Sequence, residues 1–138
     1  METIISTYCL DACAVIAYLR QEPGAEVLKA LIEQSTTFLA MHVCNLGEVY
    51  YDFFRDSGLS TAQTAWTNTL ALPLTLRRDA DDAFFQRVGV IKVEDGVSFA
   101  DAFALALAER LNVPLVSTDH HEFDAIEQKG HFRFLWLR

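Results

Sequence analysis

Residues 115–124 decide how this chain folds, and they read Leu115-Val116-Ser117-Thr118-Asp119-His120-His121-Glu122-Phe123-Asp124. Their apolar start follows Pro114 and ends abruptly in hydroxyl side chains and a carboxylate. This pattern is typical of a fully buried strand in a parallel sheet. Asp119, just past that strand, lies where α/β proteins place their functional groups. Residues 4–10 form a similar apolar run near the start of the chain, and Asp11 follows them.

The composition indicates one globular domain that spans residues 1–138. The chain is 51% hydrophobic and 22% charged, which is typical of a compact protein with a substantial core. No apolar run approaches the roughly 18 residues that a membrane span needs. The first residues carry Glu2 and no basic segment, so we expect no secretory signal and a cytoplasmic location.

Charge and cysteine content narrow the possible partners and sites. The formal net charge of −8 argues against a general electrostatic binder of nucleic acid, although a local basic strip could still contact a substrate. Arginines that could supply such contacts are Arg20, Arg55, Arg77 and Arg78, although for each of them a solvated surface charge is the favoured interpretation. The three cysteines (Cys9, Cys13 and Cys44) lie in apolar surroundings without zinc-finger spacing, so we expect buried, reduced thiols.

Strand and helix patterns alternate along the chain, which predicts a three-layer α/β/α sandwich around a mainly parallel sheet of about five strands. We expect strands at residues 4–10, 36–43, 74–76, 115–118 and 132–137. We expect helices over residues 12–19, from Pro23, from a cap at Asn45 to Gly58, from Ser60 to Pro73, from Asp79, over 99–111 after a cap at Ser98, and over 123–128.

Four acids from distant parts of the sequence are predicted to meet at one edge of this sheet. Right-handed crossovers place all strand carboxyl ends on the same edge, and the helices that leave those strands begin there. Asp11 and Asp119 directly follow strands. Glu48 is expected in the first turn of the helix after the second strand, and Asp101 is expected in the first turn of the helix that leads to Asp119.

Each acid also has a purely structural interpretation. Glu48 and Asp101 both stand three positions after an expected capping residue, where a carboxylate stabilises a helix end by about 0.3–1 kcal/mol. Asp11 and Asp119 could cap helices or begin turns. Four carboxylates crowded together would, however, raise one another's pKa values and call for a neutralising charge. Oxygen-only ligands suit Mg²⁺ or Mn²⁺ better than zinc, and two such ions are common in phosphodiester cleavage.

The ordered motifs resemble those of PIN-domain proteins, and more narrowly those of VapC-type toxin ribonucleases from bacterial toxin–antitoxin pairs. The resemblance covers nearly the whole chain. The matching stretches are Leu10-Asp11-Ala12-Cys13, Asn45-Leu46-Gly47-Glu48, Ser98-Phe99-Ala100-Asp101-Ala102 and Ser117-Thr118-Asp119.

The resemblance implies metal-dependent endonucleolytic cleavage of RNA. It implies that Asp11, Glu48, Asp101 and Asp119 coordinate Mg²⁺, with Mn²⁺ as a possible substitute. Ser117 takes the place of the family's usual Thr, whose hydroxyl orients the site. Cys13 stands where relatives often carry a small polar residue, so a hydrogen bond made there is in doubt. Glu122 is a possible extra acid, ranked below the four.

The resemblance also implies a cognate antitoxin and a homodimer, and the aromatic run Tyr50-Tyr51-Asp52-Phe53-Phe54 is a candidate interface. The main alternative function is a catalytically silent PIN-like module that binds RNA or protein. Such a module would lack one of the acids, and here all four are present. A haloacid-dehalogenase-like phosphatase would need a second acid at position 13, which is Cys13.

Overall fold

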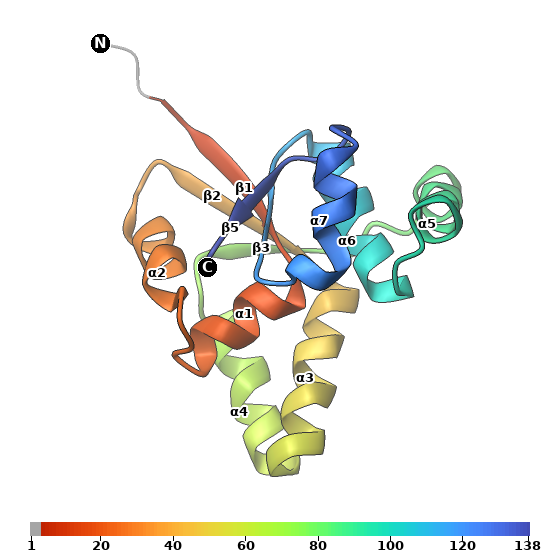
Figure 1. The fold of residues 1–138 in the computed structure, drawn as a ribbon. Coiled ribbons are helices and arrows are strands. Elements are labelled where there is room, and N and C mark those ends of the chain that lie inside the picture. Colours follow the sequence, from red (N-terminus) through yellow and green to blue (C-terminus); the bar gives the residue numbers. More distant parts are fainter. Residues whose placement is uncertain (1–3) are drawn as a thin grey trace.

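The computed structural model describes residues 4–138 and contains a five-stranded sheet in which every neighbouring pair is parallel (Figure 1). The strand order is β3-β2-β1-β4-β5, so β1 lies at the centre. The predicted three-layer α/β fold is confirmed. The strands are β1 Ser6–Leu10, β2 Thr37–His42, β3 Leu74–Arg77, β4 Leu115–Ser117 and β5 Phe134–Trp136.

Helices cover both faces of the sheet and bury two separate cores. One face carries α1 Ala12–Leu19, α2 Ala25–Glu33, α3 Val43–Ser57 and α4 Leu59–Leu70. The other carries α5 Asp82–Asp95, α6 Phe99–Leu111 and α7 His120–Gln128. Alternation along β1 divides its side chains between the two cores, with Leu10 in the first and Cys9 in the second.

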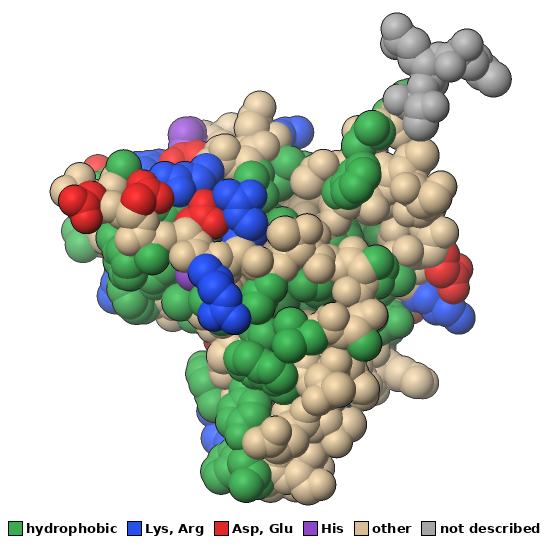
Figure 2. Space-filling view, turned by 180° about the vertical axis from the view of Figure 1, so that it is seen from behind, with side chains coloured by type: hydrophobic (Ala, Val, Ile, Leu, Met, Phe, Trp, Pro, Cys, Tyr) green, Lys and Arg blue, Asp and Glu red, His purple; other side chains and the backbone are tan. Residues whose placement is uncertain are grey.

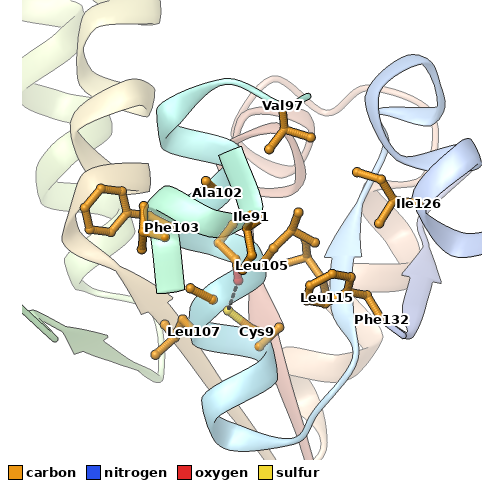
Figure 3. Close-up of a cluster of buried hydrophobic side chains, with 14 of the residues drawn as sticks. Cys9, Ile91, Val97, Ala102, Phe103, Leu105, Leu107, Leu115, Ile126 and Phe132 are labelled. Atoms are coloured by element: carbon orange, nitrogen blue, oxygen red, sulfur yellow. Dashed lines mark hydrogen bonds between the residues drawn. The ribbon is translucent and has the colours of Figure 1, made fainter. Parts of the chain in front are cut away.

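Helix α6 is the most deeply buried helix of the second core (Figure 3). All side chains from residue 101 to residue 108 are buried, and every second one from 102 onward is an alanine. The Cys9 thiol donates a weak hydrogen bond of 3.9 Å to the Ala104 carbonyl oxygen, which shows how closely this helix lies against β1. Small side chains allow this approach, because an alanine adds only a methyl group to the width of the helix.

Several helices begin at residues other than those predicted. Helix α2 begins at Ala25 after Gly24, whose φ of 97° only glycine adopts easily. A Cβ at Gly24 would lie 2.4 Å from the Leu137 carbonyl oxygen, so the close approach also requires glycine. Helix α4 begins at Leu59 without a side-chain cap, so the predicted capping role of Ser60 is wrong. Helix α7 begins at His120, three residues before the predicted start.

The start of α3 is the most informative error. The helix begins at Val43, and His42 caps it by accepting a 3.0 Å hydrogen bond from the Cys44 backbone N–H at Nδ1. The predicted cap, Asn45, lies inside the helix instead, and Glu48 therefore falls in the second turn rather than the first. Histidine is not a usual cap. Its orientation depends on the Asp79 carbonyl oxygen, 2.9 Å from His42 Nε2 and 37 residues away.

Asp79 also belongs to an ion-pair network that ties the end of β3 to α6. Arg77 donates two hydrogen bonds of 2.8 and 2.9 Å to its carboxylate, and Arg110 donates a third of 3.0 Å. Helix α5 was expected to start at Asp79, but Asp81 caps it and also pairs with Arg110. These bonds hold the pKa of Asp79 near 2. The network fixes the segment that in turn orients His42.

The surface near α3 and α4 is partly apolar. Figure 2 shows hydrophobic side chains over this hairpin at the bottom of the view, while charged side chains gather at the upper left. Tyr51 and Phe54 are half exposed, whereas Phe53 is buried and Tyr50 packs edge-on against Trp66. The aromatic run thus serves both the core and the surface. No helix within residues 4–138 has the length and apolar character needed to cross a membrane.

Candidate functional site

Asp11 and Asp119 lie at the carboxyl ends of two adjacent strands, β1 and β4. Each caps the helix that follows. Asp11 Oδ1 accepts a 2.8 Å hydrogen bond from the Ala14 backbone N–H, and Asp119 Oδ1 accepts a 3.1 Å bond from the Glu122 N–H. The capping explanation is therefore correct for both residues, and it fixes both carboxylates at the predicted edge of the sheet.

Ser117 joins these two acids. Its hydroxyl is buried, donates a hydrogen bond to Asp11 Oδ2 and accepts one of 3.0 Å from the Asp119 backbone N–H. The hydroxyl can do both because it carries one donor and two acceptor lone pairs. Ser117 thus orients the Asp11 side chain and the Asp119 backbone at the same time.

Asp101 and Glu48 approach the same edge from helices on opposite faces of the sheet. Asp101 lies in the first turn of α6, where its N–H donates a 3.1 Å hydrogen bond to the Ser98 capping hydroxyl as predicted. Glu48, in α3, accepts a 3.3 Å bond from the Tyr51 hydroxyl. We call Asp11, Glu48, Asp101 and Asp119 together the acidic site.

The pKa values of the acidic site record both burial and mutual repulsion. Burial raises the pKa of Asp11 from 3.8 to about 7, opposed by the hydrogen bond from Ser117, and the charges of Asp101 and Glu48 raise it further. Burial also raises the pKa of Asp101 to about 6, with repulsion from Glu48, Asp119 and Glu122. The pKa of Glu48 is raised by burial and by neighbouring acids, including Asp119. Burial is the larger cause, and the carboxylates are close enough to raise one another's pKa values further.

Cys13 lies among these acids. Burial raises the pKa of its thiol, and repulsion from each of the four charges raises it further. Of the three cysteines, all free, only Cys9 is fully buried; Cys13 is partly buried and Cys44 is exposed, so the expectation of a buried thiol is wrong for Cys44. The candidate phosphate contacts are largely engaged elsewhere: Arg20 and Arg55 pair with Asp52 in α3, and Arg77 pairs with Asp79.

The acidic site is not a closed ligand cage. Among residues 4–138, no three His, Cys, Asp or Glu side chains are grouped so tightly that they form a ready-made metal site. Its chemistry nevertheless fits a hard, hydrated cation. Mg²⁺ usually keeps several waters and binds one or two carboxylates directly, so it does not need a tight cage. A divalent cation would also neutralise the repulsion that raises these pKa values.

Sequence reasoning gave Asn45 the wrong role. Its side chain is fully buried, and Nδ2 donates a 3.1 Å hydrogen bond to the Ala100 carbonyl oxygen in the first turn of α6. Oδ1 has no hydrogen-bond partner within the part of the chain that the structure describes. The Asn-x-x-Glu spacing indicated a capping box, and only the position of α6 reveals the contact that Asn45 makes.

A model of the PIN domain family matches residues 8–129 of the sequence. The chain belongs to the PIN domain family. Proteins of this family are generally nucleases. Comparison of the sequence with curated proteins finds no match.

Solved structures of PIN proteins share this fold at low sequence identity. VapBC2 from Rickettsia felis, crystallised with a DNA fragment from its promoter, is 14% identical with a TM-score of 0.70 over 94% of this chain and 98% of that chain. VapC20 from Mycobacterium tuberculosis, a toxin that cleaves the sarcin-ricin loop, is 17% identical with a TM-score of 0.67, over 93% and 98%. VapBC from Salmonella typhimurium, bound to DNA, is 13% identical with a TM-score of 0.70, over 97% and 100%.

Proposed function

We propose that this PIN domain is a metal-dependent endoribonuclease, the toxin of a bacterial toxin–antitoxin pair, and that it cleaves RNA phosphodiesters at the acidic site. The observation that carries the proposal is the convergence of Asp11, Glu48, Asp101 and Asp119 on one sheet edge, where burial and repulsion raise the pKa values of three of them. The family membership and the likeness to VapC toxins support it.

In this proposal the four acids hold Mg²⁺, or Mn²⁺ in its place. A bound divalent cation supplies charge that polarises the phosphate and activates the attacking water. The residues of the chain prepare for this in the metal-free state. Because burial raises the pKa of Asp11 to about 7, its protonated form would have to release a proton in order to bind the cation. Ser117 holds the Asp11 carboxylate in place through the hydrogen bond that it donates to Oδ2.

A cleavage assay tests this function directly. Single-stranded RNA labelled at one end is incubated with purified protein and Mg²⁺ or Mn²⁺, and then with EDTA. We expect internal cuts that EDTA abolishes and that Asp11→Asn reduces at least about 100-fold, because the site loses a charged oxygen ligand. Glu33→Gln is the matched control, since Glu33 is an exposed acid at the end of α2.

The same assay separates this function from that of a catalytically silent PIN module. A silent module would bind RNA without cutting it, whatever the cation. If Asp11→Asn cuts as fast as the wild type, the activity comes from elsewhere and the acidic site is not responsible.

We propose that the protein binds a cognate antitoxin and forms a homodimer. The half-exposed side chains of Tyr51 and Phe54 in α3 and of Leu59 at the start of α4 offer apolar surface suited to such contacts. An antitoxin peptide that carries an arginine would complement the acidic edge. Two measurements test these partners: the mass in solution at micromolar concentration, which a monomer would contradict, and co-purification with the protein encoded by the adjacent reading frame.

A further inference from the structure

Asn45 joins the two helices that bring Glu48 and Asp101 to the acidic site. Its Nδ2 bond to the Ala100 carbonyl oxygen is the one hydrogen bond between α3 and α6 that the described residues make. Ala100 directly precedes Asp101, and Asn45 and Glu48 are three positions apart, on the same side of α3. The contact therefore sets how α3 and α6 sit relative to each other where their acids meet.

The orientation of the Asn45 amide is fixed by chemistry. Its nitrogen must face the Ala100 carbonyl oxygen, because two oxygens at 3.1 Å would repel each other. Oδ1 must therefore be the atom that faces away from this contact. It is buried and receives no hydrogen bond from residues 4–138.

A buried acceptor without a donor is costly, by about 1–3 kcal/mol, and native proteins rarely keep one without a reason. Leucine has nearly the same shape and would avoid the cost. The bond that Nδ2 donates to the Ala100 carbonyl oxygen, which leucine could not make, is therefore the reason that the structure offers for an asparagine at this position.

We propose that Asn45 is a positioning residue of the acidic site: the hydrogen bond that its Nδ2 donates to the Ala100 carbonyl oxygen holds α3 against α6 and so sets the spacing of Glu48 and Asp101. This inference rests on the proposed function, because it requires a cation at the acidic site. It extends that function by assigning a role to a residue that ligates nothing itself. Outer partners of this kind often change metal affinity 10- to 100-fold when they are removed.

The test compares Mn²⁺ affinity and metal-free stability in three variants. Mn²⁺ binding is measured from the electron paramagnetic resonance signal of the free ion, and stability from thermal unfolding in EDTA. Asn45→Leu removes both polar atoms, and Asn45→Ala only deletes atoms, so it remains usable if leucine fits poorly. Thr69→Val is the matched control: Thr69 is fully buried in α4, and its hydroxyl donates a 2.8 Å bond to the Ala65 carbonyl oxygen.

We expect the dissociation constant for Mn²⁺ to rise about tenfold in both Asn45 variants. Thr69→Val should keep the wild-type constant, even where its melting temperature falls further than that of Asn45→Leu. Wild-type Mn²⁺ affinity in the Asn45 variants would overturn the role of Asn45. The cation site itself would still be supported if Asp11→Asn failed to bind Mn²⁺ in the same assay. A wild-type protein that binds no Mn²⁺ would overturn both this role and the proposed function.

Discussion

Replacing Asp11 by asparagine should make the metal-free protein more stable, although the same change is expected to reduce the proposed RNA cleavage at least about 100-fold. The pKa of Asp11 rises from 3.8 in the unfolded chain to about 7 in the fold, so the folded state disfavours the ionised carboxylate. A shift of about 3 units at about 1.4 kcal/mol per unit gives an upper limit of about 4 kcal/mol at pH 8. Asparagine keeps the acceptor for the Ala14 N–H but disturbs the bond from Ser117, which offsets about 1–2 kcal/mol.

The expected net gain is therefore about 2–3 kcal/mol, or about 10 °C in melting temperature for a domain of this size. The assay is thermal unfolding in EDTA at several pH values, followed by circular dichroism. Because the folded pKa is raised, protonation favours the fold, and the wild type loses stability as the pH rises from about 4 through about 7. Asp11→Asn should thus be less stable than the wild type by about 1–2 kcal/mol near pH 4, overtake it within this window and reach its full advantage by pH 8.

Two results would refute this reasoning. One is a variant that melts below the wild type at pH 8 in EDTA, which would mean that the Asp11 carboxylate stabilises the fold as an anion. The other is a difference in melting temperature that does not change between pH 4.5 and pH 8. Glu33→Gln removes one exposed charge and should change the free energy of unfolding by no more than about 0.5 kcal/mol at either pH, so it controls for net charge.

Three further outcomes follow from the structure. Mn²⁺ should raise the melting temperature of the wild type more at pH 8 than at pH 5.5, because Asp11 and Asp101 must lose protons to bind it; equal shifts in a titration at the two pH values would contradict this. Gly24→Ala should lower the free energy of unfolding, measured in urea, by at least about 2 kcal/mol, because an alanine there is strained and clashes with the Leu137 backbone. Unchanged stability would show that the backbone at Leu137 moves to make room. Under native conditions a maleimide should label the exposed Cys44 rapidly and the buried Cys9 only after unfolding, as peptide mass analysis can determine.

The sequence was sufficient for the order of the elements and for the edge on which the acids meet. Local signals mark three of these acids. Asp11 and Asp119 follow the ends of strands, and Asp101 follows the serine that caps its helix; the structure keeps all three arrangements. The start of α3 could not be read locally. His42 caps it only because the Asp79 carbonyl oxygen, fixed by Arg77 and Arg110, orients the imidazole across 37 residues.

Asn45 illustrates the same limit from the opposite direction. An Asn three residues before a Glu is a strong capping signal, and the tertiary contact with Ala100 overrides it. Its partner lies 55 residues away, on a helix from the opposite layer of the sandwich. Contacts of this kind depend on how two helices cross the sheet edge, which periodicity and capping rules do not specify.

The alternate alanines of α6 have a consequence for how this PIN domain could change over evolution. Four alanines of this helix are nearly inaccessible to solvent: Ala102, Ala104, Ala106 and Ala108. Helix α6 therefore forms a thin layer that packs between β1 and α5. Replacing any of these alanines by valine should widen this layer and move Asp101 away from the other carboxylates. Substitutions can therefore accumulate in outer loops and on exposed helix faces, whereas the thickness of this one layer has little room to vary.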